Sequence, residues 1–212
     1  MNATMGKGRS ARARSPADLV ARFRRSQDGV AAIEFAMLAI PFFLLLFAII
    51  ESCVAYAAEQ VLDNAVDTLG RQLRTGQITF DDPARSSYMD EAAFRDAFCA
   101  EIEIMLDCSE DRLYLDVRGF QNFSQIPVAI PRVGDRPYGD LDRTEFDFAP
   151  LGSGKINMVR AYYRWQIITD LIRPHITNIR PADGSMPTDY LIVGTAAFQN
   201  EEYGNAVAAA GS

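Results

Sequence analysis

A glycine followed five positions later by a glutamate, at the start of an apolar run, is the arrangement most suggestive of chemistry here. A protease that cut after Gly29 would give Val30 a free α-amine and make Glu34 the fifth residue of the mature chain. That carboxylate can neutralise the amine of its own or a neighbouring chain in a low-dielectric setting, where such pairing matters most. Glycine suits the cut because it presents no side chain to a protease and resists helix formation. The alternative is that Glu34 marks the interfacial start of an uncleaved anchor.

The apolar run itself covers residues 35–50 and contains no charged side chain. At about 1.5 Å per residue this helix would span about 24 Å, which is short of a hydrocarbon core of roughly 30 Å. Residues 30–33 before it and 52–58 after it supply the missing length. This extension places Glu34 inside the span and Glu51 near its far edge. Charged residues are costly inside a membrane, so each is a candidate for function.

Charge is distributed unevenly about this run. Residues 1–29 have a net charge of +5, which leaves −12 on the rest of a chain whose net charge is −7. The positive-inside rule therefore predicts a cytoplasmic arm and a body on the other side of the membrane. Because the basic arm abuts the apolar run directly, nucleic acid is not expected as a partner.

A secretory signal peptide is a competing interpretation of the same segment. The tripeptide at residues 55–57 is an A-x-A-like site, and cleavage there would leave Ala58 as the first residue. The long arm and the acidic residues that flank the apolar run argue against it.

The elements that would follow are two helices and three strands. Apolar residues recur at helical spacing through residue 73, which predicts one long helix over residues 30–74 with Gly76 as its stop. A second helix is expected over residues 89–106. Strands are expected at residues 112–120, 157–169 and 190–198. This order predicts an α+β fold, in which a long N-terminal transmembrane helix continues into a domain with a second helix and a small antiparallel sheet.

Residues 121–154 are rich in Pro, Gly and Asp. We expect an ordered loop there, with a short helix near residues 144–146.

Two of the three cysteines, Cys99 and Cys108, lie in the body of the chain, and Cys53 lies at the end of the apolar segment. On one straight helix Cys99 and Cys108 would be about 13.5 Å apart and on opposite faces, whereas a disulfide needs Cα atoms within about 7 Å. We expect a disulfide, which requires the helix to end near Leu106 and the chain to turn back. The alternative is a pair of unpaired buried thiols.

Residues typical of catalysis are sparse. The only histidine, His175, is expected on the surface of a turn. The acidic stretch 135–147 lacks the spacing of a calcium loop, and residues 152–155 resemble a phosphate-binding loop without its upstream strand and glycine. We therefore predict no enzymatic activity, no cofactor and no metal site.

Several stretches together resemble the TadE family, the TadE/TadG-like minor pseudopilins of the tight-adherence pilus system. The resemblance covers most of the chain. Its parts are residues 28–36 with Pro41, residues 73–77, residues 98–99 with 106–108 and 115–117, residues 162–165, and residues 198–203. In the last stretch Gln199 and Glu202 stand where the family commonly has Arg and Pro, which leaves the roles of those two family positions open here.

The resemblance implies a non-catalytic, minor component of pilus assembly or secretion that supports pilus biogenesis and adhesion. A prepilin peptidase would cut between Gly29 and Val30, with Glu34 and Phe35 serving its recognition and later assembly. The implied organisation is a basic cytoplasmic leader at residues 1–29, a transmembrane helix at 30–58 and a periplasmic domain at 59–212.

The implied location is the bacterial inner membrane. The resemblance is also compatible with incorporation in a pilus. Implied partners are the inner membrane, the peptidase, other pseudopilins or pilin subunits, and the inner-membrane pilus platform. The alternative function is an uncleaved, single-pass periplasmic binding or envelope-attachment domain unrelated to a pilus, which would not need Glu34.

Overall fold

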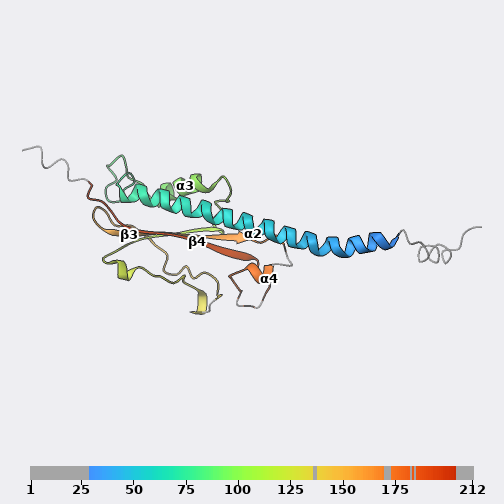
Figure 1. Ribbon diagram of the computed structural model, residues 1–212. Coiled ribbons are helices and arrows are strands. Elements are labelled where there is room, and N and C mark those ends of the chain that lie inside the picture. The colour runs from blue at the N-terminus through green and yellow to red at the C-terminus, as the bar shows by residue number, and fades with distance from the viewer. Residues whose placement is uncertain (1–28, 136–137, 170–172, 182, 184, 204–212) are drawn as a thin grey trace, which may run out of the picture. The chain divides into compact units, whose positions relative to one another are not determined.

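The computed structural model describes residues 29–135, 138–169, 173–181, 183 and 185–203 (Figure 1). The chain forms two compact units, Met1–Phe47 and Ala48–Ser212. Of the basic arm expected over residues 1–29, residues 1–28 lie outside the described residues.

The long helix predicted from the sequence is confirmed. Helix α2 covers Val30–Arg74 and passes through Pro41 without a break in its assignment. It ends where Gly76 takes a φ of +75°, a left-handed conformation that favours glycine. Arg71 and Arg74 lie in its last turn, where positive charge complements the helix dipole. Its buried side chains all belong to the second unit: Ala55, Ala58, Leu62, Ala65, Val66, Leu69 and Leu73.

The second helix is present but shorter than predicted. Helix α3 covers Glu91–Ile102, and its N-cap residue Asp90 accepts a hydrogen bond from the backbone N–H of Ala93 at 2.8 Å. Beyond Ile102 the chain turns, yet Leu106 is still buried in the same core as the helix. The apolar pattern therefore continued past the end of the helix, because the turn also contributes to the core.

All three predicted strands form, and a fourth joins them. Strands β1 (Leu113–Phe120), β3 (Ile156–Gln166) and β4 (Asp189–Gln199) pair antiparallel, as expected. Strand β2 (Phe148–Ala149) pairs parallel with β1, so the sheet is mixed, in the order β2-β1-β3-β4. The predicted α+β class is confirmed. A strand of two residues inside a loop carries no periodicity, so its pairing could not be predicted from the sequence.

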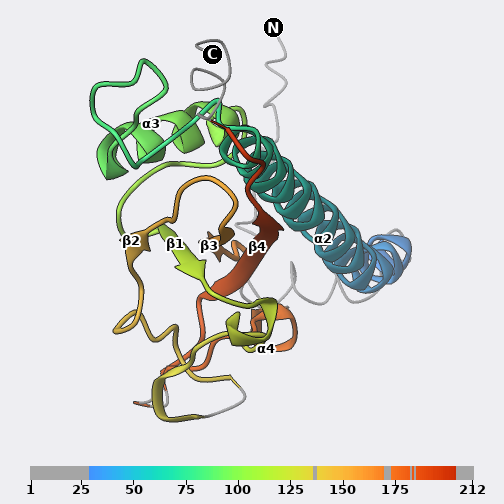
Figure 2. The same ribbon diagram turned by 90° about the vertical axis from the view of Figure 1, so that its left-hand side faces the viewer.

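The two faces of the sheet are covered differently. Helices α2 and α3 lie on one face, and the long loop between β1 and β3 lies on the other (Figure 2). Alternation along β1 matches this division, because Leu113, Leu115 and Val117 face the helices. On the loop side, a smaller core gathers around the ring of Tyr162. Phe146 stacks on that ring with the two centroids 4.7 Å apart.

In the described part of the loop between β1 and β3, the local structure differs from the prediction. Short 3-10 helices occur at η2 (Phe123–Gln125) and η3 (Val133–Asp135). Residues 144–145 form a turn, so the helix expected there was wrong. The turn is closed by Asp142, whose carboxylate accepts hydrogen bonds from Thr144, a short-range contact that leaves no helical period.

A carboxylate at the contact between α2 and β4 makes stability depend on pH. Burial, then repulsion from Glu59 and Asp67, raises the pKa of Asp63 above its usual value of 3.8. The folded state therefore binds this proton more tightly, so the stabilising effect is complete below pH 3.8 and is lost as pH rises through the folded-state pKa. We expect Asp63→Asn to stabilise the protein at neutral pH, by at most about 1 kcal/mol because the carboxyl is partly solvated.

Urea unfolding at neutral and acidic pH measures this effect. The pKa of Asp142 is lowered by hydrogen bonds from Thr144, so Asp142→Asn should change stability in the opposite direction at neutral pH. Equal changes in stability for Asp63→Asn and Asp142→Asn would contradict the opposite pKa shifts of the two carboxyls.

Candidate functional site

The predicted processing and assembly residues lie together at the start of α2. Gly29 immediately precedes the helix, and a Cβ built on it would meet no atom within 4 Å. Val30 is 52% exposed and Phe35 is 70% exposed, and Glu34 is exposed between them. Gly29 thus has open space beside its Cα, and no hydrogen bond or ion pair joins the Glu34 carboxylate to another described residue.

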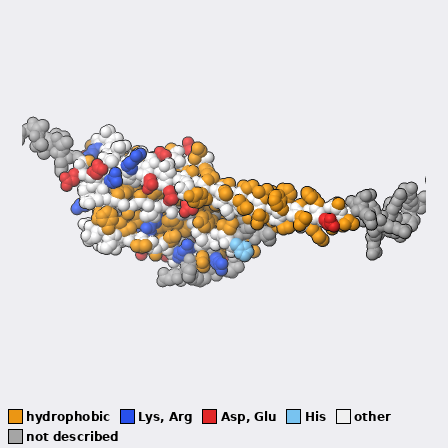
Figure 3. All heavy atoms as spheres, viewed as in Figure 1, with side chains coloured by type: hydrophobic (Ala, Val, Ile, Leu, Met, Phe, Trp, Pro, Cys, Tyr) orange, Lys and Arg blue, Asp and Glu red, His pale blue; other side chains and the backbone are white. Residues whose placement is uncertain are grey.

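The surface of α2 beyond Glu34 is apolar. Among the described residues, α2 is the one helix long and apolar enough to cross a membrane, which indicates single-pass anchoring. Hydrophobic side chains cover this stretch (Figure 3). Large apolar side chains exposed here include Met37, Leu38, Ile40, Phe42, Leu45 and Phe47. An apolar surface of this extent requires lipid or partner helices to cover it.

The second charged residue of the apolar segment, Glu51, has a partner that the sequence did not reveal. Its carboxylate accepts hydrogen bonds from the backbone N–H groups of Ile168 and Thr169, the latter at 3.1 Å to Oε2. These donors lie just after β3, more than a hundred residues along the chain. The negative charge is thereby satisfied at the end of the apolar run, which reduces its desolvation cost. No sequence signal could have found this contact, because both donors are backbone groups.

Two stretches that carried the family resemblance meet at the C-terminal end of α2. The backbone N–H of Glu201 donates to the carbonyl of Arg74 at 2.8 Å, and the two side chains form an ion pair at 3.8 Å. The ring of Tyr203 lies against Gly76, because a Cβ built on that glycine would be 2.5 Å from the ring. Residues 200–203, called the C-terminal segment below, thus satisfy a carbonyl that the helix leaves unpaired.

Asn200 ties this segment to the loop that precedes β3. It is 3% exposed, and its Nδ2 lies 3.0 Å from the carbonyls of Leu151 and Gly152 and 2.8 Å from the hydroxyl of Tyr203. Its backbone N–H donates to the carbonyl of Lys155 at 2.8 Å. Residues 152–155, which resembled a phosphate loop in the sequence, therefore hold the C-terminal segment.

Two glycines near this contact both have a positive φ and provide a matched test. Gly76 and Gly154 have φ of +75° and +69°, but a Cβ on Gly154 would meet nothing within 4 Å. Gly154→Ala should cost about 1 kcal/mol from backbone strain alone, and Gly76→Ala about 3 kcal/mol, because it also displaces the Tyr203 ring. Chemical denaturation measures both, and equal losses would contradict the packing of Tyr203 on Gly76.

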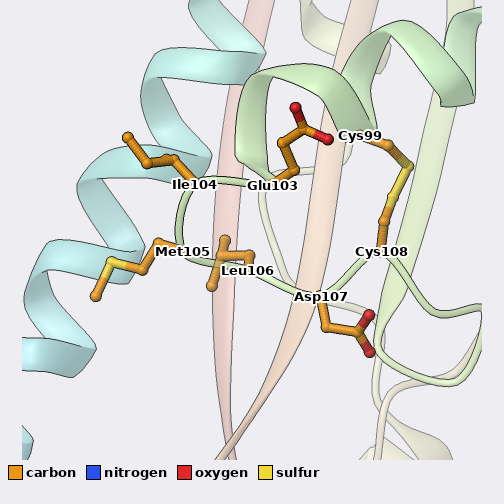
Figure 4. Close-up of a pocket in the computed structure, with 7 residues that line it drawn as sticks. All are labelled: Cys99, Glu103, Ile104, Met105, Leu106, Asp107 and Cys108. Carbon is orange, nitrogen blue, oxygen red and sulfur yellow. A yellow bond between two sulfur atoms is a disulfide. The ribbon is translucent and has the colours of Figure 1, made fainter.

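Cys99 and Cys108 form a disulfide, with Cα atoms 5.6 Å apart. The helix ends at Ile102 and residues 103–108 turn back, so the second cysteine returns beside the first (Figure 4). Cys53 is exposed and unpaired.

Reduction of this disulfide should lower the free energy of unfolding by about 2.5 kcal/mol, from the loop entropy that the cross-link removes. Denaturation with and without dithiothreitol measures the loss, and the double variant Cys99→Ser/Cys108→Ser should no longer respond. Cys53→Ser is the control and should keep the full response. Two free thiols in protein isolated from cells would contradict the bridge.

His175 and the acidic stretch 135–147 are the remaining candidates for chemistry that the sequence offered. His175 is exposed on the one-turn helix α4 (Arg173–Ile176). Asp140, from the acidic stretch, forms an ion pair with Arg164. Within the described part of the chain, no three His, Cys, Asp or Glu side chains are grouped so that they could hold a metal ion.

Together, the described elements define an α+β protein with one exposed helix that is long and apolar enough to cross a membrane. The family described as TadE-like protein matches residues 29–71, which is consistent with a TadE-family protein, as the sequence predicted. The match begins at Gly29 and includes the apolar part of α2. This family is pilus-associated and structural and is not known as enzymatic, which indicates a component associated with Tad pilus machinery and the membrane. Searches of curated proteins and of solved structures gave no match.

Proposed function

We propose that this protein is a minor pseudopilin of a tight-adherence pilus system. It is a non-catalytic component that supports pilus biogenesis and adhesion. The observation that carries the proposal is the TadE-like match, which starts at Gly29 and runs through the apolar helix. Residues 1–29 are the leader, 30–58 the transmembrane helix and 59–212 the periplasmic domain.

In this proposal a prepilin peptidase cuts between Gly29 and Val30. The open surroundings of Gly29 support access of the protease, and the helix that begins at Val30 supports a new N-terminus that is already helical. Glu34 then neutralises an α-amine within the membrane, on its own chain or on a neighbour. Phe35 follows it on the lipid-exposed surface.

The charge distribution supports an inner-membrane location with the arm in the cytoplasm and the domain in the periplasm. The disulfide is compatible with that oxidising compartment. The partners are the peptidase, other pseudopilins or pilin subunits that contact the apolar surface of α2, and the inner-membrane platform.

N-terminal sequencing of the membrane-associated protein tests the proposal directly. Val30 as the first residue supports the pseudopilin. An intact Met1 would instead favour the uncleaved periplasmic anchor, and Ala58 a secreted protein. A strain without the prepilin peptidase is the control, since it should accumulate the chain with its leader.

A further inference from the structure

The contact between Glu51 and the loop after β3 relates part of the second unit to the edge of the proposed membrane span. Glu51 is the first charged residue after the charge-free run 35–50, so it lies near the far edge of the proposed membrane span at residues 30–58. Its carboxylate holds the backbone of Ile168 and Thr169. Ile168 therefore lies beside the end of the membrane span.

Apolar side chains are exposed at this same level. Ile168 is 83% exposed, whereas other isoleucines of the second unit, such as Ile167 and Ile192, are buried in its core. Met105 lines a cavity of about 260 Å³ together with Trp165 and Ile168, which brings the turn after α3 to the same place. Its neighbour Ile104 is 85% exposed.

The turn has an apolar side and an acidic side. Ile104 and Met105 point to one side of it, whereas the carboxylates of Glu103 and Asp107 point in other directions (Figure 4). On α2, Tyr56 is 63% exposed shortly after Glu51, a position at which membrane proteins favour tyrosine.

We propose that Ile104, Met105 and Ile168 form a lipid-facing rim, which inserts into the boundary between headgroups and acyl chains. The occupant is the lipid leaflet in which the span of α2 ends, because Glu51, near the far edge of that span, holds the backbone of Ile168. Glu51 is the positioning residue that holds Ile168 at this depth.

This inference rests on the proposed membrane anchoring and adds a second membrane contact to it. The test uses the full chain with Cys53→Ser and the native disulfide retained. Single cysteines are introduced by Ile168→Cys or Ile104→Cys and labelled with bimane. The protein is reconstituted into phosphatidylcholine vesicles, with or without lipids brominated near the headgroup end of their acyl chains.

Two further positions provide matched controls. Val128→Cys probes an apolar residue that is 95% exposed and that we expect to stay in water. It follows Pro127, whose carbonyl accepts a hydrogen bond from Arg160. Arg160 lies on β3, eight residues before Ile168. Ile50→Cys probes the end of the span itself. Mass spectrometry of each variant verifies that the Cys99–Cys108 disulfide is intact.

We expect brominated lipid to remove at least half of the emission at Ile168→Cys, Ile104→Cys and Ile50→Cys, and none at Val128→Cys. Quenching at Ile50→Cys alone would overturn the rim and leave the anchoring intact. A blue-shifted, unquenched probe at Ile168→Cys would also overturn it, because protein rather than lipid would then cover the residue. No quenching at any position would overturn the membrane anchoring as well.

Discussion

Glu34→Ala should abolish pilus assembly while leaving membrane insertion intact. The helix gains an apolar residue, so insertion becomes easier. Assembly, however, loses the carboxylate that in the proposed function neutralises an α-amine in a low-dielectric setting. Leaving one member of such a pair without its partner costs about 3 kcal/mol, which corresponds to a factor of more than about 100 in association.

Surface pili measured by electron microscopy, together with carbonate-resistant membrane association, separate the two effects. Glu34→Asp is the matched control, since it keeps the charge and should retain part of the assembly. Cleavage after Gly29 is measured in parallel, so that a processing defect is not mistaken for an assembly defect. Wild-type numbers of pili with Glu34→Ala would contradict the pseudopilin function.

Asn200→Ala should lower the free energy of unfolding by about 3 kcal/mol, as much as Gly76→Ala. The substitution removes a buried amide that lies within hydrogen-bonding distance of two carbonyls and the Tyr203 hydroxyl. The Leu151 carbonyl keeps a donor in Asn157 Nδ2 at 2.8 Å, and the Gly152 carbonyl keeps the Lys155 N–H at 3.3 Å. The loss therefore comes from the hydrogen bonds of the buried amide itself, at about 1 kcal/mol each, and from the cavity that its removal leaves. The C-terminal segment should then detach from the end of α2.

Urea unfolding gives the loss, and protection of the Glu201 amide from hydrogen exchange reports detachment of the segment. Glu202→Ala is the matched control, since that side chain is exposed in the same segment. It should change stability by less than about 0.5 kcal/mol. Equal losses in the two variants would show that Asn200 does not hold the segment.

Much of the fold could be predicted because it follows from local periodicity. The apolar run and the helical stripe after it predicted α2 to its last residue, and alternation predicted β1. The limits of α3 and the short strand β2 could not be predicted. Both depend on contacts with distant parts of the chain rather than on their own residue pattern.

The candidate site divides in a similar way. Gly29, Val30, Glu34 and Phe35 are neighbours in sequence, so their common position at the start of a helix was predictable. The partner of Glu51 was not predictable, because its donors are backbone N–H groups after β3. The contact of Asn200 with residues 151–155 was also hidden, since those residues resembled a different motif.

By itself, the sequence determined a long apolar helix with a carboxylate near its start and an uneven charge distribution, and it showed a resemblance to the TadE family. Spacing along one helix is sufficient for each of these, because neighbours on a helix are neighbours in sequence. Only the tertiary structure decided what Glu51 and the C-terminal segment contact. Folding brings Glu51 to the end of β3 and Tyr203 onto Gly76, and such contacts depend on how the helices pack against the sheet.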